Sequence, residues 1–165
     1  MNTIKTWLKE ENIHLQLKAD SQLEAIWTML ELAAKSPAVV NTKQLAKSVY
    51  ESEVFSAFHR GTAGITFHAL TDAVMTPLMV VGHFENGFGY YTKEKKPIDI
   101  VVLLAAPKRY KEQLKDIINC VRDMLCDADF LENIRNTKSP AMIYEYFQQL
   151  CMELSVKKSV KKIKQ

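Results

Sequence analysis

The chain lacks a long hydrophobic run and has few glycines, prolines and cysteines. No stretch of its 165 residues approaches 18 consecutive apolar residues, so we expect no transmembrane helix. With only 5 glycines and 5 prolines it is neither collagen-like nor of low complexity. The 3 cysteines, Cys120, Cys126 and Cys151, are odd in number and without metal-ligand spacing. This excludes a disulfide framework and a zinc site, and favours reduced thiols in a cytoplasmic protein.

What is present is an ordinary globular composition with its basic charge at one end. The chain is 47% hydrophobic and 25% charged, with a net charge of +3. Five lysines fall in the last nine residues, and without them 17 basic groups face 19 acidic ones. We therefore predict one domain over residues 1–154 and a basic C-terminal tail over residues 155–165. The tail is either a solvated terminus or a docking element for an acidic partner, nucleic acid or an anionic membrane. The N-terminus does not have the pattern of a signal peptide.

Apolar periodicity predicts helices at both ends of the chain and strands between them. Strands are expected over residues 13–17, 64–68, 78–84 and 98–105, the last of them an unbroken apolar run typical of a covered central strand. Leu23 and Trp27 belong to the apolar stripe of the first predicted helix, and Asn86-Gly87 forms a plausible turn. Ser21, Asn41 and Ser139 are the predicted N-caps. The fold class is therefore α/β, a mixed β-sheet with helices packed on its faces.

Two sequence blocks have a recognisable order and spacing. The first is Gly64-Ile65-Thr66-Phe67-His68-Ala69, and the second runs from Phe84-Glu85-Asn86-Gly87-Phe88 to Lys96-Pro97-Ile98-Asp99 and Leu103-Leu104-Ala105-Ala106-Pro107. Together they resemble the enzyme IIA domain of the bacterial sugar phosphotransferase system, in its fructose/mannitol/nitrogen-regulatory class. The resemblance covers about residues 5–150 and implies the mannitol-class enzyme IIA fold. No single motif in it is highly specific.

In that family a histidine accepts a phosphoryl group, and the resemblance places this histidine at His68. Glu53 and Gly61 also match the family pattern. Four departures surround them: Ser52 stands at the family's active-site arginine, Ala57-Phe58-His59 at its Ser-Thr-Gly loop, Phe67 at the proline before the histidine, and Gln113 at the second active-site histidine.

Transfer to histidine needs a neutral ring nitrogen in line with phosphorus and hydrogen-bond donors around the phosphoryl oxygens. Four side chains are candidates for stabilising these oxygens: His59, Arg60, Thr66 and Gln113. Thr66 shares a face with His68 if the strand is regular. His59 and Arg60 are alternatively a solvated loop pair. Lys108-Arg109 is either a charge pair at a helix start or a basic rim of the phosphoryl site. His14 and His83 look like ordinary strand residues.

Two functions remain open. The first is a phosphocarrier that takes a phosphoryl group on His68 from the histidine-containing phosphocarrier protein and passes it to an enzyme IIB or holds it as a signal, in nitrogen-regulatory signalling more than in sugar uptake. The second is a degenerate family member that binds a regulatory partner without chemistry. Neither needs a metal or an organic cofactor. Nucleic-acid binding is not expected, because outside the tail no basic stripe is interleaved with aromatic residues.

Overall fold

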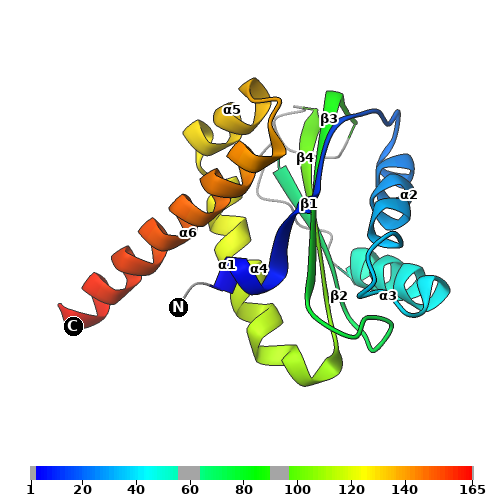
Figure 1. Cartoon of the computed structure of the whole chain (residues 1–165), viewed down its shortest axis with the longest axis horizontal. Coiled ribbons are helices and arrows are strands. Elements are labelled where there is room, and N and C mark those ends of the chain that lie inside the picture. The colour runs from blue at the N-terminus through cyan, green and yellow to red at the C-terminus, as the bar shows by residue number, and fades with distance from the viewer. Residues whose placement is uncertain (1–2, 56–63, 90–96, 165) are drawn as a thin grey trace.

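The computed structural model describes residues 3–55, 64–89 and 97–164, which form a mixed sheet with helices on both faces (Figure 1). In chain order the elements are α1 (Thr3–Trp7), β1 (Leu8–Leu17), α2 (Gln22–Ala33), α3 (Thr42–Phe55), β2 (Gly64–Leu70), β3 (Leu78–Phe88), β4 (Ile98–Ala106), a 3-10 turn η1 (Lys108–Tyr110), α4 (Lys111–Leu125), α5 (Ala128–Asn136) and α6 (Pro140–Ile163). None of the helices described here is long and apolar enough to cross a lipid bilayer.

The four strands are ordered β1-β3-β4-β2. β1 runs parallel to β3, β3 antiparallel to β4, and β4 parallel to β2. The carboxyl ends of β2 and β4 therefore lie at the same end of the sheet as the amino ends of β1 and β3. β2 is an edge strand, and β4 lies inside the sheet. The predicted α/β class with a mixed sheet is confirmed.

Each face of the sheet has its own hydrophobic core. The side chains of β4 point alternately into one core and into the other. Ile100, Val102 and Leu104 face the core under α1, α4, α5 and α6, whereas Val101, Leu103 and Ala105 face the core under α2 and α3. Every one of these side chains has no measurable exposure. The unbroken apolar run thus marks a central strand covered on both faces, as predicted.

The three predicted N-caps are confirmed by hydrogen bonds. Ser21 Oγ accepts from the Glu24 N–H at 3.2 Å, Asn41 Oδ1 from the Gln44 N–H at 3.0 Å, and Ser139 Oγ from the Met142 N–H at 3.4 Å. In a capping box the Glu24 carboxylate would accept from the N–H of the N-cap residue Ser21. Here Glu24 Oε2 accepts from the Asp20 N–H instead, at 2.7 Å.

Two local predictions were wrong. Leu23 and Trp27 were expected inside, but they are 56% and 52% exposed; α2 approaches the sheet through Ala25, Met29 and Ala33 instead. The strand was expected over residues 78–84 with a turn at Asn86-Gly87, yet β3 continues through these residues to Phe88. Both residues have φ of 66°, and the register with β4 shifts between His83 and Phe88. The turn residues therefore make an irregularity within the strand rather than its end.

Candidate functional site

His68 lies on the edge strand β2, two residues before the strand ends. It is half-buried and in register with Leu104 of β4, which belongs to the core under α4. Thr66 and Leu70 pair with Val102 and Ala106 of the same core, so His68 shares their face of the sheet. The imidazole is therefore placed on the α4 side of the sheet, at its open edge.

The other candidate residues differ in how the structure places them. Thr66 is on the same face as His68 but only 6% exposed, one pleat further into the core. Gln113 is exposed in the first turn of α4. Ser52 is half-buried on α3, the helix that packs on the opposite face of the sheet. His59, Arg60 and Gly61 lie outside the described residues, and so does the side chain of Glu53.

The geometry of α4 separates its own residues into those near β2 and those away from it. A Cβ built on Gly64, the first residue of β2, would meet Leu125 Cδ2 at 2.8 Å. The face of α4 that carries Leu125 therefore borders β2. Gln113 lies about 120° around the helix from Leu125, given 3.6 residues per turn. Its side chain thus starts from a different face of α4.

The face that borders β2 carries cations that sequence reasoning missed. Lys111, Lys115, Ile118, Arg122 and Leu125 follow one another at spacings of three and four residues, which places them in one stripe along the helix. We call Lys111, Lys115 and Arg122 the α4 basic stripe. The spacing was visible in the sequence, but only the packing of Leu125 against Gly64 shows that this stripe borders the strand of His68.

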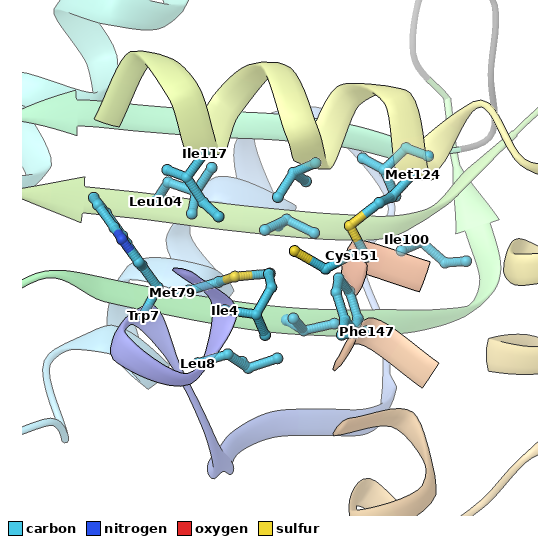
Figure 2. Close-up of a cluster of buried hydrophobic side chains, with 14 of the residues drawn as sticks. Ile4, Trp7, Leu8, Met79, Ile100, Leu104, Ile117, Met124, Phe147 and Cys151 are labelled. Atoms are coloured by element: carbon cyan, nitrogen blue, oxygen red, sulfur yellow. The ribbon is translucent and has the colours of Figure 1, made fainter. Parts of the chain in front are cut away.

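Within the stripe, Lys115 lies nearest to the level of His68. His68 is four residues beyond Gly64, or about 13 Å along a strand. α4 runs in the opposite direction, and 13 Å along a helix is about nine residues. Counting back from Leu125 gives roughly residue 116. Figure 2 agrees, since Ile117 lies over Leu104, the register partner of His68.

The turns at the carboxyl ends of β2 and β4 are tied together. The Thr71 N–H donates to the Ala106 carbonyl at 2.8 Å, and the Lys108 N–H donates to Asp72 Oδ1 at 3.1 Å. Arg109 Nη2 donates to the Met75 carbonyl at 3.1 Å, and its guanidinium stacks on Tyr110 at 5.0 Å from the ring centroid. Arg109 thus holds the 71–77 turn, which favours the structural alternative for the Lys108-Arg109 pair.

A second polar cluster lies at the other end of β4. Arg135 of α5 donates to Asp99 through Nε at 2.5 Å and Nη2 at 3.0 Å, and His83 Nε2 lies 3.7 Å from Asp99 Oδ2. Burial alone would raise the pKa of Asp99, but the neighbouring His83 and Arg135 side chains outweigh burial and lower it. The same contact raises the pKa of Arg135. This cluster is a bidentate ion pair that ties α5 to the sheet.

Comparison with known families and structures gives one consistent answer. The model of the family described as phosphoenolpyruvate-dependent sugar phosphotransferase system, EIIA 2, matches residues 6–150. The nitrogen regulatory protein IIA-Ntr of Neisseria meningitidis is similar in fold, with a TM-score of 0.76 at 11% identity over 84% of this chain and 94% of that one.

Two structures from Escherichia coli are similar as well. IIA mannitol has a TM-score of 0.70 at 22% identity over 85% of this chain and 98% of that one. The enzyme IIA of a complex between IIA mannitol and phosphorylated IIB mannitol has a TM-score of 0.69 at 21% identity, over 85% and 96%. Comparison with curated protein sequences gives no match.

Proposed function

This chain belongs to the EIIA 2 family of the phosphoenolpyruvate-dependent sugar phosphotransferase system, and we propose that it accepts a phosphoryl group on His68 from the histidine-containing phosphocarrier protein. The observation that carries the proposal is the position of His68. The ring is half-buried near the carboxyl end of an edge strand, beside a helix face that carries three cations.

The transfer itself needs little covalent participation from the protein. The lone pair of the acceptor ring nitrogen forms a bond to phosphorus as the nitrogen–phosphorus bond of the donor breaks and returns its electron pair to the donor ring. The neutral form of an imidazole offers this lone pair. The protein's contribution is to hold the ring in line and to place donors around the phosphoryl oxygens.

Lys115 is the described side chain best placed to supply the positive charge that Ser52 does not supply. An ammonium group is a compact charge with three N–H donors on a flexible stem, which lets it reach an oxygen without a fixed fork. Lys111 and Arg122 lie one and two turns from it in the α4 basic stripe and add to the local potential. Thr66 lies deeper, and we assign it to positioning the strand.

The phosphorylated protein would then pass the group to an enzyme IIB or a regulatory protein. The complex of IIA mannitol with phosphorylated IIB mannitol is a precedent in a protein of the same fold. The fold is shared by a nitrogen regulatory protein and by IIA mannitol, so it is compatible with the proposed role in regulatory signalling and does not distinguish that role from one in sugar uptake. Such a carrier would act in the cytoplasm, where free thiols such as those of this chain stay reduced.

A second function, binding to a regulatory partner without phosphoryl transfer, is favoured by one observation. Ser52 and Gln113 occupy the positions of the family's arginine and second histidine, so two polar groups of the family site are replaced. Removal of a single preorganised donor typically costs about 10²–10³ in rate. In this alternative the fold and the docking surface remain, and His68 is a structural edge residue.

The test is phosphorylation in a defined mixture. The protein is incubated with phosphoenolpyruvate, enzyme I and the histidine-containing phosphocarrier protein, and its intact mass is read without acid treatment. We expect an acid-labile gain of one phosphoryl group in the wild type and none in His68→Ala. No gain in the wild type, with a family member of known activity phosphorylated alongside, would support the binding function.

A further inference from the structure

Two thiols from distant parts of the chain meet between α4 and α6. Cys120 and Cys151 are 31 residues apart in sequence, yet their Sγ atoms lie 3.8 Å apart. Cys120 is half-buried and Cys151 is 4% exposed. Figure 2 shows Cys151 projecting from α6 into the core beneath α4. The S–S bond of a disulfide is about 2.05 Å long, so a small approach of the two side chains would suffice to form one.

A cavity gives small molecules access to this pair. It has a volume of about 410 Å³, and its lining includes both cysteines together with Asn119, Ser155 and Lys158. The cavity therefore gives a small molecule such as hydrogen peroxide a route to the two thiols. The third cysteine, Cys126, caps the end of α4 and is exposed.

The surroundings of the pair favour a thiolate on Cys151. A hydrogen bond from Cys120 is the largest influence; together with the Ile4 backbone N–H and the positive charge of Lys158 it outweighs burial and lowers the pKa of Cys151 to about 7. The same hydrogen bond and burial raise the pKa of Cys120. The thiolate is the reactive form of cysteine.

We propose that Cys120 and Cys151 form a peroxide-reactive site that closes to an intramolecular disulfide between α4 and α6. The Cys151 thiolate attacks one oxygen of hydrogen peroxide, the S–O bond forms as the O–O bond breaks, and hydroxide leaves. The Cys120 sulfur then attacks the sulfenic sulfur of Cys151, the S–S bond forms, and the sulfenic oxygen leaves as water with the Cys120 proton. In total, two thiols and one hydrogen peroxide give one disulfide and two waters.

The reaction is independent of phosphoryl transfer and uses residues that the proposed phosphorylation does not need. Cys120 and Ile117 lie in adjacent turns of α4, so the disulfide would fix the helix that borders His68 to the C-terminal helix. Exposed Cys126 supplies the internal comparison, because simple exposure would make it the more reactive thiol.

The test is oxidation of the whole protein by hydrogen peroxide, followed by thiol alkylation and peptide mapping. We expect a mass loss of two hydrogen atoms, one remaining alkylatable thiol at Cys126, and a cross-linked peptide that joins Cys120 to Cys151. Cys126→Ser should react like the wild type. Cys120→Ser should stop at a sulfenic acid on Cys151, trapped by dimedone, and Lys158→Gln should slow the oxidation several-fold.

Faster oxidation of Cys126 than of Cys151, or a cross-link through Cys126, would overturn the proposal. So would recovery of both Cys120 and Cys151 as free thiols after a treatment that oxidises Cys126. Serine is close in size to cysteine, and circular dichroism of each variant before oxidation checks that the fold is kept.

Discussion

The two half-buried histidines on the α4 side of the sheet, His83 and His68, lie toward opposite ends of β4 and have different surroundings. His83 pairs with Ile100 and His68 with Leu104, and both partners belong to the same core. His83 lies beside Asp99, which Arg135 already binds through two hydrogen bonds. His68 lies on the edge strand, next to a helix face whose cations extend into solvent.

Burial and strand position alone therefore do not distinguish a histidine in an ion-pair cluster from one that is open to a reaction partner. His83 shares the carboxylate of Asp99 with Arg135. This ion-pair cluster connects β3, β4 and α5, which gives His83 a structural role. His68, at the edge of the sheet, has exposed cations of α4 on the neighbouring helix face, and such a setting can meet an anionic partner. The proposed phosphoryl site and the ion-pair cluster should therefore be separable by mutation.

The largest expected effect is on phosphorylation, and it should separate the two histidines completely. His68→Ala removes the acceptor nitrogen and should abolish the acid-labile mass gain, whereas His83→Ala should leave it unchanged. Circular dichroism and thermal unfolding of both variants check that each folds. Loss of phosphorylation in His83→Ala, with an intact fold, would show that the distinction between the two ends of β4 is wrong.

The next largest expected effect is on the free energy of unfolding, at the end of β4 that carries Asp99. Arg135→Met leaves the carboxylate of Asp99 partly buried without its bidentate partner, and we expect the free energy of unfolding to fall by about 1–3 kcal/mol. Each kcal/mol should lower the melting temperature by about 2–4 °C in a chain of this size. Arg122→Met, at an exposed arginine of α4, is the matched control. An equal loss in the control would mean that the ion pair contributes little.

The sequence predicted the fold better than the site. The apolar run of β4 and the caps at Ser21, Asn41 and Ser139 are local signals, and local signals transfer directly to structure. The interior position of Trp27 was wrong because small residues on the neighbouring face brought α2 to the sheet instead. The α4 basic stripe was missed because its proximity to β2 depends on Leu125 packing against Gly64, a contact between distant parts of the chain.

A smaller effect on the rate of phosphorylation is expected from Lys115, at the end of the sheet that carries His68. Lys115→Gln should lower the rate of His68 phosphorylation by roughly tenfold, below the 10²–10³ typical of a buried donor, because Lys115 is exposed. Lys47→Gln, on α3 at the opposite face of the sheet, should have no effect. Rapid-quench phosphorylation measures both rates. Equal rates for wild type and Lys115→Gln would exclude the lysine from the site.

The two polar groups of the family pattern that this chain lacks can be restored by substitution. Ser52→Arg combined with Gln113→His restores the two polar side chains of the family pattern. If the family arrangement holds despite the placement of Ser52 on α3 and of Gln113 on another face of α4, the rate of phosphorylation should rise by a few-fold. The double variant without His68 should remain unreactive. A rate unchanged from the wild type would mean that the site has been rebuilt around other residues, and the effect of Lys115→Gln would then show which.

The smallest expected effect is the pH dependence of the stability that Asp99 contributes at its end of β4. Because the pKa of Asp99 is lower in the folded protein than its ordinary value of 3.8, the folded state binds protons less readily than the unfolded state there. The stability that Asp99 contributes is therefore fully present above about pH 4 and is lost as pH falls through the folded pKa.

Asp99→Asn cannot titrate, so its stability deficit relative to the wild type should shrink between about pH 4 and pH 2. Urea unfolding at a series of pH values measures the difference, with Asp129→Asn, an exposed residue on α5, as the control. A deficit that stayed constant down to pH 2 would mean that the carboxylate gains no net free energy from Arg135 and His83. The ion pair would then orient α5 without stabilising it, and the two ends of β4 would differ in accessibility alone.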